Sequence, residues 1–519
     1  MSSLAKLSIG TAVAVTLFIN VKGSAQTLAE PPSASAESPS DKEQPQSGFE
    51  LRELPESQLD SVQALEPKPG GLTADEVAAK AVKSSPTLRA RQAEIDAAQA
   101  KVDDAVARFL PRLTLKASYQ RLSEVSSELG GAIVGSSEPS ATIRIGPCSP
   151  GSTEQCAVNE SGIPIGAQEF EFPSLVNTYA LNASLSLPLS DYLLRLSKSI
   201  AATQENRRAA ELQKEAVLRK IESDARIAYY NWLKTLAGCA VAQASLERFN
   251  ALLADARTAY DVGSTTKADV LRLEAAVAGT QYAIIETETL RSVAEEQLAV
   301  FMGEPVKRYQ VGEAVAVDAA GVEATGELKA LIADAFRQRL ELEALKAGGE
   351  SLREGSGALA IGRWPRLDAF GDVTYANPNQ RIFPQEEEWN ATWAVGLSLS
   401  WNINDAFSGS AQSAEIDALR AKLEANLEEL ERGIKLEVTS AYMFLKKARV
   451  AVETSSRSSA AAKEAYRVAS DLYRVGRATT TDLISAESEL VAASIKEINA
   501  ALDYHVAKIM LAHAVGKKL

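Results

Sequence analysis

The residues with the clearest potential for chemistry are two aspartates that occupy the same place in a repeated motif. Residues 260–271 read YDVGSTTKADVL, and residues 473–484 read YRVGRATTTDLI. Asp269 and Asp482 are the acidic residues that the two copies share at one position. Such a carboxylate is a candidate for a catalytic role or for attracting cations. Each copy precedes a long segment rich in alanine, glutamate and leucine.

The same motif also has a purely structural interpretation. Each aspartate stands three residues after a threonine, Thr266 or Thr479, which is the spacing of a capping box at the start of a helix. Gly263 and Gly476 are placed to end the preceding helix as left-handed caps. The motif therefore predicts a helical hairpin, and this is compatible with a further role for the aspartates.

No other residues form a recognisable catalytic or metal-binding pattern. His505 and His513, the two histidines, stand too far apart to lie one turn from each other on a helix face. The sequence has no H-E-x-x-H, C-x-x-C, Walker or G-x-S-x-G motif. Most remaining carboxylates fall on helical segments, where we expect them to face solvent. We therefore predict that the protein is not an enzyme and has no cofactor or metal.

Composition and charge narrow the class of protein. The chain has 519 residues and a formal net charge of -13. This charge argues against a nucleic-acid partner, because phosphate contacts require clustered Lys and Arg. Glycine and proline are sparse while alanine, leucine and glutamate dominate, a composition that favours long helices.

The first residues have the pattern of a signal peptide. Lys6 precedes an apolar run at 7–21, and Gly23-Ser24-Ala25 then offers small residues for cleavage. A membrane anchor is the alternative, but this run is shorter than the roughly 20 residues of a spanning helix. We expect 1–25 to be removed on export and 26–70, rich in Ser, Pro, Glu and Gln, to be a disordered leader.

The three cysteines suggest one disulfide. Cys148 and Cys156 lie close together in a loop rich in Gly, Pro and Ser. In an oxidising compartment we expect them to close a small disulfide loop. Cys239 stands alone in a helical pattern and is predicted to be a packed side chain.

After the leader, the chain divides into two similar halves, 71–303 and 327–519, with a linker at 304–326. Each half opens with a helical segment, about 73–108 and 327–355. An x-Pro-Arg-Leu sequence ends each of these helices, because the residue before a proline is pushed out of the helical conformation.

Each half continues with two stretches in which residues alternate between large apolar and small or polar. Such stretches are typical of β-strands. A soluble sandwich also has alternating strands, but two strands per half are too few for its core. The lengths, roughly 9–13 residues, fit tilted strands that cross a membrane. The clearest apolar series is Trp393, Val395, Leu397, Leu399, Trp401 and Ile403.

A long helical run without proline follows the strands of each half, at about 192–260 and 406–473. Each would extend on the order of 100 Å. After the repeated motif comes a return helix, at about 266–302 and 480–516. The return helix and the opening helix together match the length of the long one, which predicts paired helices with coiled-coil-like packing.

Neither part can complete its fold within one chain. Four strands cannot close a barrel around a lumen, and the paired helices bury little alone. A symmetric oligomer resolves both deficits, and three copies would supply twelve strands.

This order of elements, the leader and the two Y-x-V-G…D turns resemble the TolC-type outer-membrane efflux proteins, from about residue 72 onward. The resemblance implies a mixed α and β membrane protein: a homotrimer with a 12-stranded transmembrane barrel in the outer membrane of a Gram-negative bacterium. A long helical tunnel would extend from it into the periplasm. Members are passive exit ducts that work with a periplasmic adaptor and an inner-membrane transporter in efflux or type I secretion.

In this family the turns lie at the periplasmic tip, where they line the entrance and meet the adaptor. The resemblance therefore implies that the carboxylates of both motifs form rings at a gate. The other implied residues are these: Tyr260, Tyr473 and Arg477 at the gate, and Val262, Gly263, Val475 and Gly476 at the adaptor contact. Ala478 and Ser485 replace an arginine and an acidic residue of better-known members, so the salt-bridge gate is expected to differ.

The alternative from another class is a structural coiled-coil spacer or adhesin of the cell envelope. A spacer has no use for strands with one lipid-compatible face, so the alternating strands favour the duct. The connection at 121–176, longer than its counterpart at about 376–390, is expected to be a large outer loop. The sequence does not identify the cargo.

Overall fold

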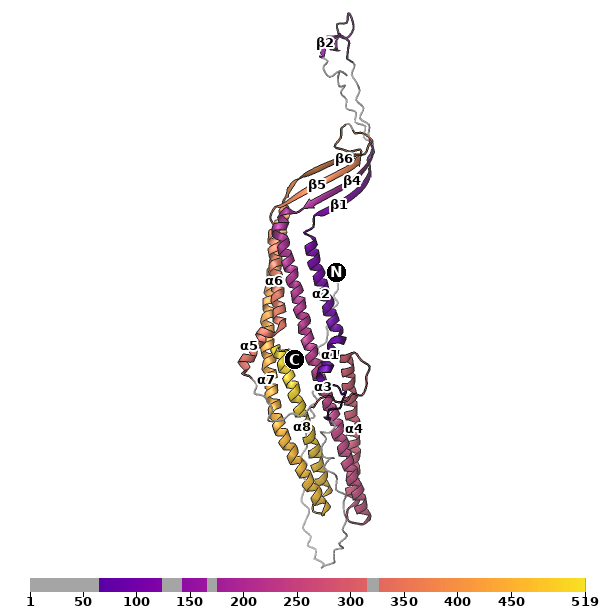
Figure 1. Cartoon of the computed structure of the whole chain (residues 1–519), viewed down its shortest axis with the longest axis vertical. Coiled ribbons are helices and arrows are strands. Elements are labelled where there is room, and N and C mark those ends of the chain that lie inside the picture. The colour runs from indigo at the N-terminus through magenta and orange to yellow at the C-terminus, as the bar shows by residue number, and fades with distance from the viewer. Residues whose placement is uncertain (1–64, 124–141, 166–174, 315–325, 384, 519) are drawn as a thin grey trace, which may run out of the picture. The chain divides into compact units, whose positions relative to one another are not determined.

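The computed structural model describes residues 65–123, 142–165, 175–314, 326–383 and 385–518 (Figure 1). The predicted signal peptide and most of the predicted leader lie outside these residues. Parts of the expected outer loop and of the linker between the halves also lie outside them.

The opening helix of the first half is divided in two. The structure has α1 (Ala74–Ser84) and α2 (Pro86–Ala107) where the sequence predicted one helix. The Thr73 hydroxyl accepts a hydrogen bond from the backbone N–H of Glu76, so the predicted N-cap is confirmed. The division arises because Pro86 has no N–H to continue α1, while the Ser85 hydroxyl caps α2.

The corresponding helix of the second half is divided as well, into α5 (Leu328–Gln338) and α6 (Leu340–Ile361). No proline is present here. Arg339 takes an extended backbone conformation between the two helices, and its guanidinium donates to Glu341, to Glu437 and to the carbonyl of Ala514. Contacts with distant segments therefore accompany this break, which the sequence pattern did not show.

Four strands form one antiparallel sheet in the order β1-β4-β5-β6. Their bounds are β1 (Arg112–Arg121), β4 (Asn177–Leu187), β5 (Arg366–Asn377) and β6 (Asn390–Ser400). Each half supplies two neighbouring strands, and the pair β4–β5 joins the halves. The sheet lies at one end of the long helices (Figure 1).

The strand register gives the sheet two different faces. Directly paired residues point to the same face, and Leu113 pairs with Leu185 while Leu367 pairs with Leu399. The side chains of this apolar face are largely exposed in the single chain. The opposite face carries pairs such as Asp368 with Ser398. The alternation predicted from the sequence is confirmed, and it separates an apolar face from a polar one.

The long helices agree closely with the predicted ranges. They are α3 (Leu196–Asp261, 66 residues) and α7 (Ile403–Arg474, 72 residues), and the return helices α4 (Lys267–Met302) and α8 (Thr480–Val515) have 36 residues each. A five-residue π-helix, η3 (Asp191–Arg195), precedes α3. Helix α4 packs on one end of α3 and α2 on the other, so two shorter helices accompany the long one as expected (Figure 1).

Apolar side chains hold the helices together in three clusters. The first cluster joins α1, α3, α4 and α8 around Trp232 and Tyr229. The second joins α5, α6, α7 and α8 around Ile434. The third, which we call the inter-repeat cluster, lies near the turns and draws on α3, α4, α7 and α8. Its members are Phe249, Leu252, Leu253, Ala256, Leu273, Val277, Tyr466, Leu483 and Leu490.

A small hairpin lies within the expected outer loop. Strands β2 (Arg144–Pro147) and β3 (Gln155–Val158) pair antiparallel, and a disulfide joins Cys148 to Cys156 with Cα atoms 5.0 Å apart. The sequence suggested the disulfide but not the strands. Cys239 is a buried free thiol, in agreement with the prediction.

Across the described ranges, the helices all lack the combination of length and apolar character that crossing a membrane requires.

Candidate functional site: the paired helical turns

The two repeated motifs end helices α3 and α7 in the same way. Gly263 and Gly476 have positive φ angles of 78° and 72°, as predicted for left-handed caps. The backbone N–H of Ser264 donates to the carbonyl of Ala259, and the N–H of Gly263 donates to the carbonyl of Tyr260. Both bonds have counterparts at the second turn, which gives the Schellman arrangement at each.

The second turn begins α8 with a complete capping box. The backbone N–H of Asp482 donates to the Thr479 hydroxyl at 3.2 Å. In return the Asp482 carboxylate accepts from the Thr479 hydroxyl at 2.7 Å and from its N–H at 2.9 Å. These bonds from Thr479 lower the pKa of Asp482. Asp482 is exposed and charged at neutral pH.

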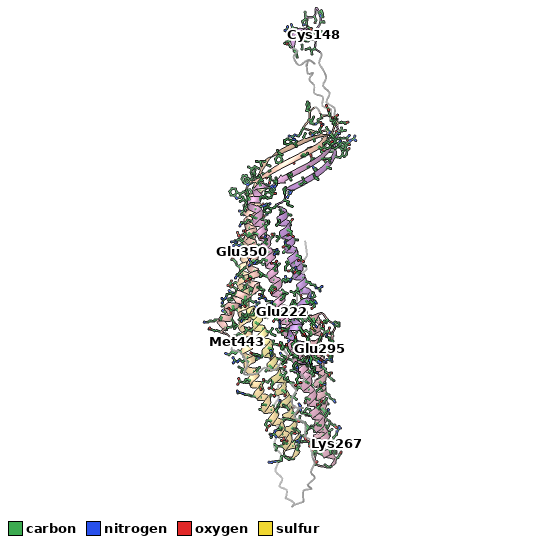
Figure 2. The ribbon with its side chains drawn as sticks, in the orientation of Figure 1. Cys148, Glu222, Lys267, Glu295, Glu350 and Met443 are labelled. Carbon is green, nitrogen blue, oxygen red and sulfur yellow. A yellow bond between two sulfur atoms is a disulfide. The ribbon has the colours of Figure 1, made fainter. Side chains whose placement is uncertain are left out.

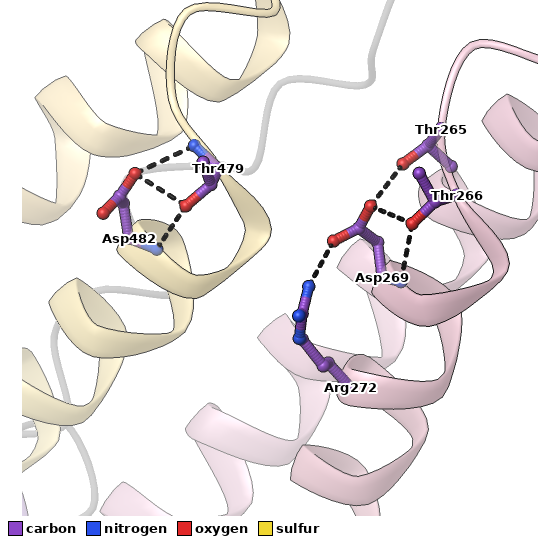
Figure 3. A network of polar contacts seen from close by, with 6 residues as sticks. All are labelled: Thr265, Thr266, Asp269, Arg272, Thr479 and Asp482. Carbon is purple, nitrogen blue, oxygen red and sulfur yellow. Dashed lines mark hydrogen bonds and ion pairs between the residues drawn. The ribbon is translucent and has the colours of Figure 1, made fainter. Parts of the chain in front are cut away.

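The first turn places its aspartate in a denser set of polar contacts (Figure 3). The Asp269 carboxylate accepts from the Thr266 hydroxyl at 2.6 Å and from the Thr265 hydroxyl at 3.3 Å, and it forms an ion pair with Arg272 at 3.0 Å. The bond from Thr266 is the main cause of the lowered pKa of Asp269. The two aspartates, equivalent in sequence, therefore differ in their surroundings.

The two turns lie next to each other. The hydroxyl of Thr480, a buried residue of the second turn, also contributes to the lowered pKa of Asp269 in the first. Lys267, the first residue of α4, lies at the end of the helices that is remote from the sheet (Figure 2). The structure thus gathers both motifs at one end of the helical part.

The remaining predicted residues of the motifs take different positions. Val262 and Val475 are 66% and 67% exposed, and Tyr260 and Arg477 are also exposed. Tyr473 instead packs against the inter-repeat cluster. Valines and glycines at the tips are therefore available for contact, whereas one of the two tyrosines is partly used for packing.

Sequence reasoning missed a buried ion pair close to the turns. Arg248 of α3 and Glu487 of α8 have side chains that are 6% and 0% exposed, and two guanidinium nitrogens lie 2.8 Å from one carboxylate oxygen. Burial raises the pKa of Glu487, and the charge of Arg248 opposes this effect. The expectation that helical carboxylates face solvent was wrong here and at Glu295, which is also buried.

Within the described ranges, no group of three or more His, Cys, Asp or Glu side chains is arranged to hold a metal ion. Among the described residues, the polar groups that stand out are the carboxylates at the turns and the buried ion pair of Arg248 with Glu487. The contacts of Asp269 and Asp482 cap the first turns of α4 and α8.

Comparison with known proteins identifies a curated relative over part of the chain. The curated Outer membrane efflux protein BepC of Brucella suis biovar 1 (strain 1330) is 25% identical over 333 residues, which cover 61% of this chain and 69% of that protein.

Solved structures share the fold at low identity. CusC, studied for the conformational changes that accompany folding and transmembrane channel formation, has a TM-score of 0.66 and 16% identity, with 86% of this chain and 92% of CusC covered. The open state of the MtrE outer membrane channel of Neisseria gonorrhoeae has a TM-score of 0.64 and 16% identity, with 86% and 89% covered.

The family model matches segments of both halves. Residues 77–304 and 331–517 match the family described as Outer membrane efflux protein, so both halves are included. The chain therefore belongs to the outer membrane efflux protein family, and its place is the outer membrane of a Gram-negative bacterium, with the helical part in the periplasm.

Proposed function

We propose that three copies of this chain form a passive exit duct, a barrel in the outer membrane continued by a helical tunnel in the periplasm. The observation that carries this proposal is the sheet. Its outer strands, β1 and β6, have no further partner among the described strands. Unpaired edges invite pairing with another copy, and threefold symmetry would join three sheets into twelve strands.

The exposure of the apolar face supports lipid as its surroundings. In β6, Trp393, Val395 and Leu397 are all exposed, while Gly396 and Ala394 face the other side. A water-soluble protein rarely leaves so many large apolar side chains in one exposed patch. Strands of 10 to 12 residues also match the thickness of a membrane. The polar face would line the lumen.

The paired turns supply the proposed periplasmic entrance. In a trimer, Asp269 and Asp482 would each form a ring of three carboxylates, which favours cations over anions. The lowered pKa of each keeps both rings charged at neutral pH. Tyr260 and Arg477, also exposed at the turns, would contribute to the same rim.

The tips of the turns are the proposed contact for a periplasmic adaptor, which links the duct to an inner-membrane transporter. The exposed valines Val262 and Val475, each beside a glycine with positive φ, present small apolar surfaces for such a partner. The duct needs no cofactor, because the transporter supplies the energy. Nucleic acid is not expected to be a partner.

Conductance in planar lipid bilayers tests the duct. We expect the purified protein to be a trimer in detergent and to form stable channels. A monomer that gives no channel would refute the proposal and leave the coiled-coil spacer as the remaining candidate.

A narrower experiment tests the carboxylate rings. We expect the double variant Asp269→Ala with Asp482→Ala to form channels with weaker cation selectivity. Asp417→Ala removes an exposed carboxylate of α7 far from the turns and is the matched control. Unchanged selectivity of the double variant would count against the rings without affecting the duct itself.

A further inference from the structure

We infer that Arg248 and Glu487 form a fixed joint between the two halves of the chain, so that any opening at the turns is confined to the helix ends beyond this pair. The inference rests on the proposed function only in taking the turns as the entrance. Arg248 and Glu487 would act as positioning residues, which set where the two hairpins can separate.

The chemistry of the pair makes it a fixed point. Both side chains are removed from water, and the Nε and a terminal nitrogen of Arg248 approach the same carboxylate oxygen of Glu487 at 2.8 Å. Separating the helices at this level would leave two desolvated charges without each other, which is strongly unfavourable. Apolar contacts have no such directional requirement.

Three helices surround the pair. Tyr466 of α7 belongs to the inter-repeat cluster, and burial together with the nearby Glu487 raises the pKa of Tyr466 to about 12. Ser245 of α3 is buried and donates to Glu487 as well. The pair thus ties α3 of the first half to α8 of the second, inside packing that also includes α7.

The position of the pair defines the length of the helix ends that lie beyond it. Between Arg248 and Asp261, the last residue of α3, the helix rises about 20 Å. Between Thr480, the first residue of α8, and Glu487, it rises about 10 Å. Beyond the pair the halves meet through apolar contacts such as Leu483, through the Thr480 hydroxyl near Asp269, and through the charge of Arg474 near Asp255.

On the other side of the pair, large buried side chains hold the same helices together. The cluster around Trp232 includes Leu233 of α3 and also Ile498 and Leu502 of α8. Motion is therefore restricted from that side by bulk packing and at the pair by charge. The helix ends beyond the pair are held by the smaller inter-repeat cluster, and opening at the turns would have to separate those contacts.

Electron–electron distance measurement between spin labels tests the joint. Labels at Val262→Cys and Val475→Cys, in a Cys239→Ser background, report the separation of the two turns in the detergent-solubilised full chain. The labelled chain is mixed with an excess of unlabelled chain, so that each assembly contains one labelled copy and the distance is measured within one chain. We expect a narrow distance distribution in the parent and a broader one, shifted to longer distance, after Glu487→Gln.

Two further variants keep the test decisive. Glu295→Gln removes another buried, ion-paired carboxylate and should leave the distribution narrow, because its partners Arg291 and Arg308 lie in the first half and the adjoining linker and do not belong to the second half. The apolar double variant Arg248→Met with Glu487→Leu preserves the packing while removing the directional contact. We expect it to fold and to show the broad distribution.

Each outcome has a distinct meaning. A narrow distribution in both Glu487→Gln and the apolar double variant would overturn the joint. Equal broadening in Glu295→Gln would also overturn it, because loss of any buried charge would then suffice. Absence of conductance in the parent protein would instead refute the duct, and it would not alter the distance result.

Discussion

Replacing Val395 by arginine provides a direct test of which face of the sheet meets lipid. Val395 is 72% exposed and lies in the middle of β6, paired with Gly371 on the apolar face. Its neighbour Ala394 lies on the polar face, paired with Asp372. The two positions differ by one residue in sequence and by a whole face in the sheet.

The expected cost follows from the depth of Val395. An arginine facing lipid at the midplane of a membrane barrel costs about 2–4 kcal/mol. Because 1.4 kcal/mol corresponds to a factor of ten, each chain of Val395→Arg should lose roughly 30- to 700-fold in its folding equilibrium. Ala394→Arg should be tolerated, since its guanidinium would face the lumen opposite the carboxylate of Asp372.

The assay is reversible urea unfolding of the protein in lipid vesicles, combined with the amount of each variant in the outer-membrane fraction. We expect Val395→Arg to be depleted and destabilised and Ala394→Arg to resemble the parent. Equal loss in both variants, or loss only in Ala394→Arg, would refute the assignment of the two faces.

Three further predictions concern the turns and the joint between the halves. Gly476→Ala should destabilise the second turn by about 1–2 kcal/mol, because Gly476 has a positive φ. Gly433 lies inside α7 with open space around it, so Gly433→Ala should stabilise the protein by about 0.5–1 kcal/mol. Equal changes in unfolding free energy for the two variants in denaturation experiments would contradict this. The pKa of Asp482 lies below the usual 3.8, so its cap should stabilise α8 at neutral pH and be lost as the pH falls through that lowered value. Amide hydrogen exchange in the first turn of α8 should become faster as the pH falls through this value. If Asp482→Asn showed the same pH-dependent change, the cap would not depend on the charge of Asp482. Glu487→Leu should cost about 3–5 kcal/mol of unfolding free energy, while adding Arg248→Met should restore most of it; an equal cost in the double variant would disprove the buried-charge explanation.

The local elements could be read from the sequence because their causes are local. Period-two alternation predicted the strands, and the spacing of Thr479 and Asp482 predicted the start of α8. The glycines of the two motifs predicted the helix ends, because few other residues adopt positive φ. The predicted return helices differ from α4 and α8 by a residue at an end.

Where prediction failed, the cause was a contact between distant segments or a signal that was not weighed. The division at Arg339 involves carbonyl and carboxylate partners far along the chain. The division at Ser85 had a visible signal in Pro86, which the periodic pattern obscured. The short hairpin β2–β3 has strands of four residues each, too short for alternation to identify.

The sequence alone thus determined the long helices, the return helices and the four strands of the main sheet, where the turns lie, and which family the chain resembles. Only the tertiary structure decided that Glu487 is buried against Arg248, 239 positions away, and that Asp269 has more polar partners than Asp482. The physical reason is that helix caps and alternation depend on neighbours within a few residues. The environment of a charge depends on which distant helix packs across it, and no local pattern specifies that partner.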